Sequence, residues 1–195
     1  MTSESLVARA KRALNQGAAN PFARPASDPE PAAATQTAAP LSRREQCLLL
    51  DCSGSMAGPV ADEWGSPSKH EAMRALLPQF GVTRRFAFSD GCAESPRLPA
   101  PDGSTNMAGA FAALKAAGIR HAVIITDGEP NDERAVLRAA AGLRLDIIYV
   151  GPPPEPPFLA ALARACAGTA QSASLKQPAQ IAKKVREVLM LPPGK

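Results

Sequence analysis

Three separated segments of this chain carry side-chain oxygens of the kind that bind a hard divalent cation. Asp51, Ser53 and Ser55 alternate in the first segment, and Thr105 and Asp127 stand in the second and third. Carboxylates and hydroxyls are hard donors, and no imidazole or thiolate is obviously aimed at them, so the set suits Mg²⁺, Mn²⁺ or Ca²⁺ better than zinc. We therefore predict a divalent-cation site built from these five residues.

The chemistry of such a site favours the capture of a carboxylate. Only two of the five predicted ligands are carboxylates, so they neutralise the ion's charge once and leave the rest of its shell to hydroxyls and water. A cation held in this way can exchange a water for one more anionic oxygen. We expect a Glu or Asp of a protein partner to supply it. The alternative is a metal-dependent hydrolase, in which the same ion activates water or polarises a phosphate or ester.

Catalytic motifs are missing from the sequence, which favours binding over hydrolysis. It contains no Lys-Ser/Thr phosphate loop, no Asp-x-Asp of the HAD type and no Gly-x-Ser-x-Gly elbow. The two histidines, His70 and His121, fall in a predicted helix and at the start of a predicted strand, so neither is placed as a general base. We predict that the chain is not an enzyme.

Two of the three segments follow short apolar runs that predict buried parallel strands. Cys47-Leu48-Leu49-Leu50 precedes Asp51, and Ala122-Val123-Ile124-Ile125 precedes Asp127. Ligands of open α/β sheets bind at the carboxyl edge of the strands. The two carboxylates are therefore expected at that edge.

The remaining pattern alternates strand and helix. Further strands are predicted at 85–89, at 92–97 as an edge hairpin, at 145–150 and weakly at 170–175. Helices are predicted after the Ser66-Pro67 cap, at 106–117, from Asp132, after the prolines of 152–157, and over 181–189. Val136, Leu137 and Ala140 are expected to face inward, and Gly168 to close the helix after the prolines. Repeated βα units predict an α/β fold with a doubly wound parallel sheet.

Length and composition allow one folded domain with an appendage. The chain has 195 residues, 45% of them hydrophobic, which suits a single core. Residues 1–15 have the pattern of a short amphipathic docking helix, and the Ala- and Pro-rich stretch 16–44 is predicted to be a disordered linker. A frayed tail is the alternative for this region. We place the folded domain at 45–191 and a short tail at 192–195.

Charge and cysteine usage limit the classes of partner. The net charge is +4, but residues 1–44 hold six Lys or Arg against three Asp or Glu, so the folded part is nearly neutral. With aromatic residues at 4%, we expect no nucleic-acid partner. The four cysteines form no Cys-x-x-Cys pair, which is typical of free thiols in a reducing compartment. No apolar run approaches the roughly 18 residues that span a membrane, so we expect a cytoplasmic protein with no membrane contact.

Together the three segments resemble the metal-ion-dependent adhesion site (MIDAS) of von Willebrand factor A (VWA) domains. Asp51-x-Ser53-Gly54-Ser55-Met56, Gly103-Ser104-Thr105-Asn106 and Ile125-Thr126-Asp127-Gly128 agree with it in order, spacing and strand context, over about residues 46–190. The resemblance implies a Rossmann-like, mostly parallel sheet with helices on both faces and one short antiparallel edge strand. It also implies a Mg²⁺ bound directly by Ser53, Ser55 and Thr105, and by Asp51 and Asp127 directly or through water.

The sequence is similar to the small intracellular, prokaryotic-type members of this family, and the likeness implies a class of partner. Such members often work with ring-forming AAA+ ATPases of the MoxR type or in multi-protein assemblies. We expect an adaptor whose N-terminal segment makes a second contact with the partner. Asp62, Glu63 and Trp64 lie in a loop that departs from the family pattern, and we predict that they form a partner-binding rim. Packing of Trp64 over the first helix is the alternative.

Overall fold

The computed structural model describes residues 45–61, 64–82 and 84–189. The predicted docking helix (1–15), the linker (16–44) and the tail (192–195) lie outside these residues, as do Asp62 and Glu63 of the predicted rim. These predictions stay predictions, and the fold is described for the residues from 45 to 189.

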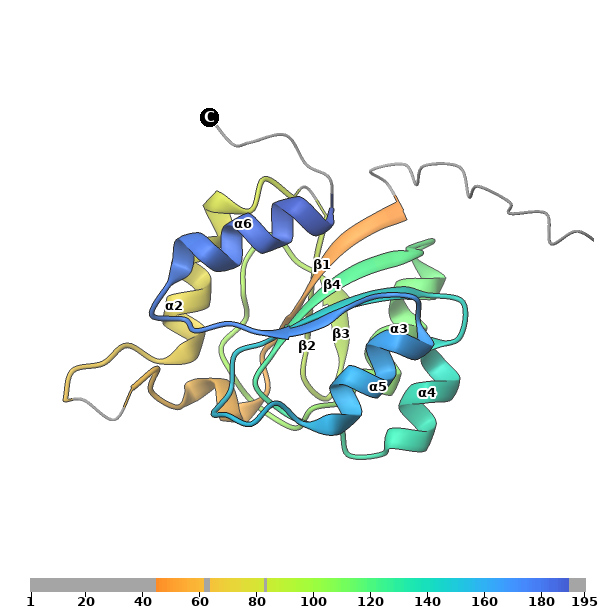
Figure 1. Ribbon diagram of the computed structural model, residues 1–195, viewed down its shortest axis with the longest axis horizontal. Helices are drawn as coiled ribbons and strands as arrows, with labels where there is room; N and C mark the ends of the chain where they lie inside the picture. Colours follow the sequence, from red (N-terminus) through yellow and green to blue (C-terminus); the bar gives the residue numbers. More distant parts are fainter. Residues whose placement is uncertain (1–44, 62–63, 83, 190–195) are drawn as a thin grey trace, which may run out of the picture. The chain divides into compact units, whose positions relative to one another are not determined.

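A six-stranded sheet runs through the domain in the order β3-β2-β1-β4-β5-β6 (Figure 1). Neighbouring strands pair in parallel, except that β3 pairs antiparallel with β2 at one edge. The chain thus has the predicted α/β, doubly wound fold with one short antiparallel edge strand. The strands are β1 (Gln46–Asp51), β2 (Arg85–Phe88), β3 (Cys92–Glu94), β4 (His121–Thr126), β5 (Arg144–Tyr149) and β6 (Ala170–Ser172).

Strands β1 and β4 lie in the middle of the sheet because their side chains are apolar on both faces. Their register pairs Leu49 with Ile124 and Leu50 with Ile125, and all six residues of β4 are buried. Strands of this kind need helices above and below the sheet. The pairing brings the end of β1 and the end of β4 together at the carboxyl edge, where two of the predicted segments begin.

Helices cover both faces of the sheet, with α2 and α6 on one face and α3, α4 and α5 on the other (Figure 1). Phe111, Val136 and Leu159 belong to one core cluster, and Met73 and Ile181 to the other. The helices are α2 (Lys69–Leu76), α3 (Met107–Ala116), α4 (Glu133–Ala140), α5 (Pro157–Ala165) and α6 (Pro178–Val188), with 3₁₀ turns η2 (Gly54–Ala57) and η3 (Leu77–Gln79).

Helix α2 begins two residues later than the sequence pattern predicts. Its N-cap is Ser68 rather than Ser66, because Ser68 and Glu71 form a reciprocal capping box. Ser68 Oγ accepts a hydrogen bond from Glu71 N at 3.1 Å, and Glu71 Oε2 accepts one from Ser68 N at 2.9 Å. This cap fixes the backbone position of Lys69, the first residue of the helix, and so the point from which its side chain extends.

Leu137 on α4 is wrongly predicted to face the core. It is 42% exposed, whereas Val136 and Ala140 are 1% and 0% exposed. Residues four apart share a face of a helix, but adjacent ones do not. The buried face defined by Val136 and Ala140 therefore turns Leu137 toward solvent.

The end of α5 also differs from the prediction. The residue in the left-handed region is Ala167, at φ 52°, rather than Gly168. Gly168 has another role, because a Cβ there would collide with the carbonyl oxygen of Leu145 in β5. A glycine is needed where the chain passes this close to the sheet.

A buried polar cluster lies where β4 begins, at the amino end of the strand. His121 Nε2 is 2.8 Å from Asp146 Oδ2, and both the backbone N and the Oγ1 of Thr169 donate to Asp146 Oδ1 at 2.8 Å. Burial disfavours the charged form of Asp146, but the hydrogen bonds from His121 and Thr169 outweigh it and hold the pKa of Asp146 below its usual value. The cluster ties β4, β5 and the chain entering β6 together.

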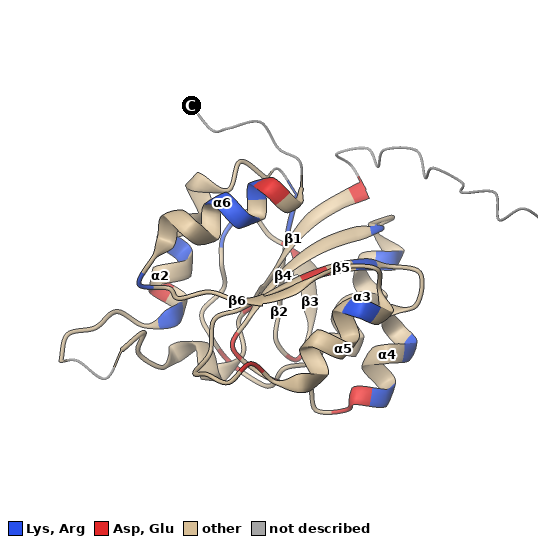
Figure 2. Cartoon of the chain, in the orientation of Figure 1, with Lys and Arg blue, Asp and Glu red and all other residues tan. Residues whose placement is uncertain are grey.

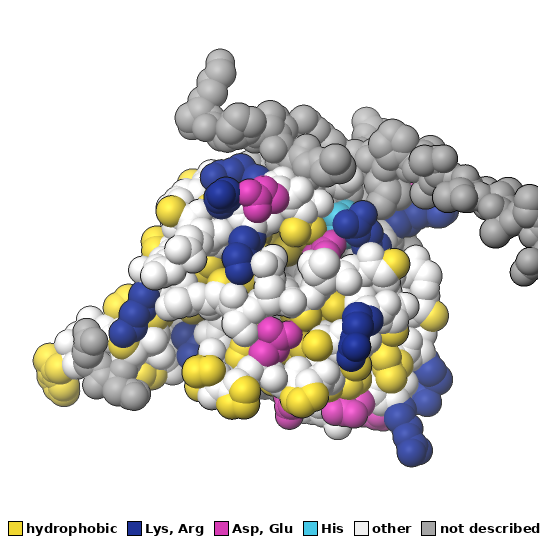
Figure 3. All heavy atoms as spheres, viewed as in Figure 1, with side chains coloured by type: hydrophobic (Ala, Val, Ile, Leu, Met, Phe, Trp, Pro, Cys, Tyr) yellow, Lys and Arg dark blue, Asp and Glu magenta, His cyan; other side chains and the backbone are white. Residues whose placement is uncertain are grey.

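Charged side chains are spread over the surface. Figure 2 shows Asp and Glu in several of the loops at its lower edge, and Figure 3 shows Lys and Arg scattered over the visible face without a continuous basic patch. Within 45–61, 64–82 and 84–189, no helix is both long enough and apolar enough to cross a membrane.

Candidate metal centre

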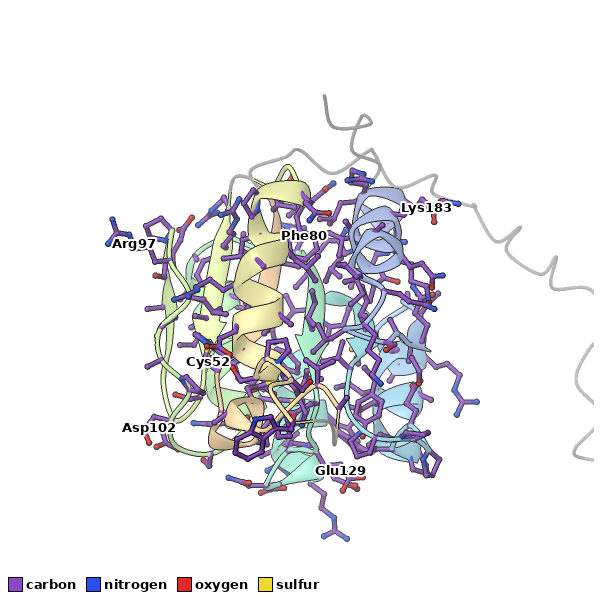
Figure 4. All side chains as sticks on the ribbon, turned by 90° about the vertical axis from the view of Figure 1, so that its left-hand side faces the viewer. Cys52, Phe80, Arg97, Asp102, Glu129 and Lys183 are labelled. Carbon is purple, nitrogen blue, oxygen red and sulfur yellow. The ribbon has the colours of Figure 1, made fainter. Side chains whose placement is uncertain are left out.

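The five predicted ligands come from three chain segments at the carboxyl edge of the sheet: the end of β1 with the loop after it, the loop before α3, and the loop after β4. In Figure 4, Cys52, Asp102 and Glu129, each close in sequence to a predicted ligand, lie in the lower half of the view. Phe80 and Lys183 lie toward the upper end. The loops that carry the predicted ligands therefore gather at one end of the sheet, as the strand pattern predicts.

Asp51 ends β1 and is fully buried. Its Oδ1 accepts a hydrogen bond from Ser53 N at 2.8 Å, and its Oδ2 accepts one from Thr126 Oγ1 at 2.5 Å. Burial raises the pKa of Asp51 against the lowering effect of these hydrogen bonds, and the nearby charge of Asp127 adds to the rise. A buried carboxylate that is hard to ionise is one that a cation would stabilise strongly. Thr126, which orients it, is absent from the predicted set.

The two serines connect Asp51's loop to Asp127. Ser53 immediately precedes the 3₁₀ turn η2, which contains Ser55, and their Oγ atoms are 3.1 Å apart. Ser55 Oγ then donates to Asp127 Oδ1 at 2.7 Å. Residues 72 positions apart are thus in direct contact, and four of the five predicted ligands form one continuous group.

Lys69 contacts Asp127 from the first residue of α2, and sequence reasoning missed it. Its Nζ is 2.5 Å from Asp127 Oδ2 and 3.4 Å from the Ser55 carbonyl oxygen. The two side chains are 17% and 1% exposed, so this ion pair is largely shielded from water. A positive charge therefore lies against the predicted ligand group. The capping box Ser68-x-x-Glu71 was a signal that would have placed Lys69 at a helix start, but nothing in the sequence points it at Asp127.

Thr105 lies in a loop that is fastened to the loop after β1. Gly54 N donates to Gly103 O at 3.0 Å, and Asp102 N donates to Cys52 O at 2.9 Å. Thr105 itself is 8% exposed, and its Oγ1 would lie 3.4 Å from a Cβ built on Gly128. The third predicted segment is thus held beside the other two.

Asp90, in the turn that follows β2, positions this loop. Its Oδ1 accepts hydrogen bonds from Ser104 N at 2.9 Å and Ser104 Oγ at 2.5 Å, and its backbone oxygen accepts one from Asn106 Nδ2 at 2.9 Å. The two hydrogen bonds from Ser104, the one from its hydroxyl first, hold the pKa of the Asp90 carboxyl below its usual value. Gly103, at φ +69°, passes so close that a Cβ would collide with the Asp90 carboxylate.

The residues present fit a hard divalent cation. Two carboxylates and three hydroxyls converge, Gly128 leaves space beside Thr105 Oγ1 and Ser55 Oγ, and the ammonium of Lys69 shows that the group attracts positive charge. Nowhere in the described part of the chain do three or more His, Cys, Asp or Glu side chains group as a metal site would need. A cation here would therefore depend on the hydroxyls.

Other reactive side chains play structural parts. Cys52 is buried, its Sγ is 3.9 Å from Leu50 O, and burial, followed by the charge of Asp51, raises the pKa of its thiol to about 12. His70 Nε2 lies 2.6 Å from the Pro99 carbonyl oxygen. The Asp102 carboxylate accepts from Gly103 N at 2.8 Å, as in a turn.

Trp64 is fully exposed to solvent, so it does not pack over α2. A groove of about 630 Å³ borders the ligand group at Lys69. It lies between the loop after η2 and the chain segments that follow β5 and β6, and its lining includes Gly58, Val60, Ala61, Val150, Ser172 and Leu175. A second, smaller hollow shares Val60 and Ala61 with the groove and includes Trp64. The groove therefore adjoins Lys69, and the second hollow continues from the groove toward Trp64.

Comparison with known proteins identifies the fold. No family model and no curated protein matches the sequence. Among solved structures, the von Willebrand factor type A protein of Catenulispora acidiphila superposes with a TM-score of 0.55 at 22% identity, over 74% of this chain and 41% of that one. The fold is that of a von Willebrand factor A domain.

Two further solved structures superpose on 74% of this chain. Manganese-loaded TRAP protein from Plasmodium vivax has a TM-score of 0.51 at 17% identity, over 74% of its own length. Proximal thread matrix protein 1 from the mussel byssus has a TM-score of 0.53 at 14% identity, over 44% of its length. The chain therefore spans less than half the length of two of these three relatives. At such identities the likeness concerns the fold.

Proposed function

We propose that this chain is a metal-dependent protein-protein interaction module, whose cation captures an acidic residue of a partner. The observation that carries the proposal is the convergence of Asp51, Ser53, Ser55 and Asp127 in one hydrogen-bonded group, with Thr105 beside it. Mg²⁺ fits this donor set, and Mn²⁺ and Ca²⁺ share its preference for oxygen. One of the structurally similar proteins, TRAP from Plasmodium vivax, is manganese-loaded.

The cation's role in this proposal is to accept a carboxylate. Two ligand carboxylates balance the charge of a divalent ion once, and the neutral hydroxyls leave it able to bind a further anionic oxygen in place of water. Trp64, exposed in a loop next to the groove, would supply an aromatic contact at the rim. We propose that Asp62 and Glu63 belong to the same partner-binding rim.

The proposed partner is a protein with an exposed Glu or Asp, within a multi-protein assembly for which this chain is an adaptor. A MoxR-type AAA+ ATPase, the partner class implied by the resemblance, is the first candidate. The N-terminal segment is proposed as a second contact, which would raise the effective concentration of the domain at the partner. The proposal places the complex in the cytoplasm.

Affinity capture tests the proposal, with the full chain as bait in Mg²⁺ and in EDTA. Ser95→Ala is the matched control, because Ser95 follows β3 and lies beside the amino end of β2, at the opposite end of that strand from the candidate centre. The wild-type protein and this control should retain the same partner in Mg²⁺. EDTA and Ser53→Ala should both release it. Capture that is indifferent to EDTA and to Ser53→Ala would contradict the proposal and move the interaction to the tail or another face.

The same proteins test the hydrolase alternative. Hydrolysis of a phosphate or acetate ester of p-nitrophenol should not exceed the uncatalysed rate in Mg²⁺. Turnover that is lost in Asp51→Ala would favour the hydrolase instead, because a Mg²⁺-bound water would then be the nucleophile.

A further inference from the structure

Lys69 places a positive charge against Asp127, one of the two predicted carboxylate ligands. Its ammonium takes one oxygen of Asp127, while the other oxygen accepts from the Ser55 hydroxyl. Both oxygens of a predicted ligand are therefore engaged within the chain. A divalent ion that used Asp127, directly or through water, would compete with this ammonium for the same carboxylate.

The position of Lys69 is not explained by the stability of its own helix. It is the first residue of α2, where a cation faces the positive end of the helix dipole. Its backbone is nevertheless fixed there, because Ser68 and Glu71 cap the helix and Lys69 N donates to Gly58 O at 2.8 Å. These contacts tie the start of α2 to the chain just after η2, which carries Ser55.

We propose that Lys69 is a tethered internal cation that neutralises Asp127 in the metal-free protein and is displaced when a divalent ion binds. The inference rests on the proposed function, since it concerns the same centre. Lys69 thereby sets the metal concentration at which the centre becomes competent, and so regulates capture of the partner. Without it, Asp127 at 1% exposure would be a nearly buried, unpaired carboxylate.

The groove beside Lys69 gives its side chain space to move away from Asp127. The same side chain borders the groove of about 630 Å³, and its four-carbon stem can swing the ammonium from Asp127 toward solvent there. In that position the ammonium adjoins the surface at which the proposed acidic partner would arrive. Metal binding would thus exchange an internal ion pair for a positive charge at the rim.

Metal binding measured without any partner tests this inference. The full chain is titrated with Mn²⁺, and the signal of free aquo Mn²⁺ is followed by electron paramagnetic resonance. Lys69→Met removes the charge and keeps much of the stem, Lys69→Arg keeps the charge, and Lys183→Met makes the same change at the far end of the domain (Figure 4).

Lys69→Met should bind Mn²⁺ about tenfold more tightly than wild type, because a unit positive charge within a few ångströms of the ion is removed. Lys183→Met and Lys69→Arg should stay close to wild type. Mn²⁺ should also raise the melting temperature of Lys69→Met by more than that of wild type. This second measurement tests the inference even if Lys69→Met is only marginally stable in EDTA.

Two results would overturn the inference. Equal or weaker Mn²⁺ binding by Lys69→Met, when wild type binds one ion, refutes competition but leaves the metal centre and the proposed function standing. Absence of Mn²⁺ binding in wild type and all three variants refutes the centre itself, and the inference falls with it.

Discussion

Gly128 contributes to the candidate centre through the side chain that it lacks. A Cβ at this position would lie 3.4 Å from Thr105 Oγ1 and 3.9 Å from Ser55 Oγ, which are two of the predicted ligand atoms. Gly128→Ala should therefore weaken Mn²⁺ binding about tenfold, because the added methyl group would fill space beside these two hydroxyls that a bound ion and its water ligands would need. Isothermal titration calorimetry measures the change.

Gly91→Ala is the matched control for this substitution. A Cβ at Gly91 would meet no atom within 4 Å, so metal affinity should stay at the wild-type value. Equal affinities in Gly128→Ala and Gly91→Ala would remove Gly128 from the centre. A large loss of stability in Gly128→Ala without metal would instead assign the glycine to folding.

Thr126 is the side chain on which the orientation of Asp51 depends. Thr126→Val keeps the shape of the side chain but removes its hydrogen bond to Asp51 Oδ2 and its acceptance from Gly128 N at 3.2 Å. Removing this hydrogen bond from the buried Asp51 carboxylate should lower the free energy of unfolding by about 1–3 kcal/mol in EDTA. Urea denaturation measures this, and an unchanged midpoint would mean that Asp51 is held by other contacts.

At the scale of elements, the loop that carries Thr105 depends on how closely Gly103 approaches Asp90. Gly103→Ala places a side chain on a backbone at φ +69° and drives it into a carboxylate that Ser104 holds in place. We expect a loss of about 2–4 kcal/mol in the free energy of unfolding, and weaker metal binding because Thr105 is displaced.

Gly81→Ala separates the two causes of that loss. Gly81 has nearly the same backbone conformation, at φ +67°, but a Cβ there would meet nothing within 4 Å. It should therefore cost only the backbone strain, about 1 kcal/mol, and leave Mn²⁺ affinity unchanged. Equal effects of the two substitutions would show that Asp90 does not fasten the loop.

The polar cluster that joins β4, β5 and β6 should give the domain part of its dependence on pH. The pKa of Asp146 is lower in the folded protein than its usual value, so its contribution to stability is complete above a pH of about 4. It is lost as the pH falls through the lower folded value. Asp146→Asn should be less stable than wild type by about 1–3 kcal/mol near pH 7, because the hydrogen bonds of His121 and Thr169 to a charged carboxylate are weakened or lost.

The difference in unfolding free energy between wild type and Asp146→Asn should narrow as the pH falls from about 5 to about 2. Denaturant melts across this range measure it, and taking the difference cancels the other acidic groups. A gap that does not change with pH would show that the charge of Asp146 contributes nothing.

The sequence predicts the strands far better than the contacts between loops. Continuous apolar runs led directly to β1 and β4, and with them to the edge at which Asp51 and Asp127 lie. The contact of Lys69 with Asp127 joins residues 58 positions apart. No hydrophobic periodicity in the sequence indicates a contact of this kind. Asp90 looks like an ordinary turn residue until the fold brings Ser104 to it.

At the scale of the whole molecule, the VWA fold brings the three segments together, but a fold of this kind does not by itself carry a metal. The sheet order places β1 between β2 and β4, so the loops after all three strands meet at one edge. Asp90 follows β2, Asp51 ends β1, and Asp127 follows β4. Topology accounts for the meeting of these residues, and the side-chain types account for the chemistry proposed there.

Occupancy of the centre should be visible in the stability of the whole domain. A cation that binds the folded chain and not the unfolded one should raise the free energy of unfolding by about 2.7 kcal/mol at one hundred times its dissociation constant. A rise in melting temperature with Mg²⁺ or Mn²⁺ that persists unchanged in Asp127→Ala would show that the ion binds elsewhere.

The most direct measurement of the central claim is the number of Mn²⁺ ions bound per chain, in wild type and in Ser53→Ala/Thr105→Ala. Two hydroxyl ligands from different loops are removed together, while the carboxylates and Lys69 remain. We predict one ion per wild-type chain and none in the double variant at the same concentrations, with both proteins folded in EDTA. No bound ion in wild type, or one ion in both proteins, would contradict the claim that these loops form a metal centre.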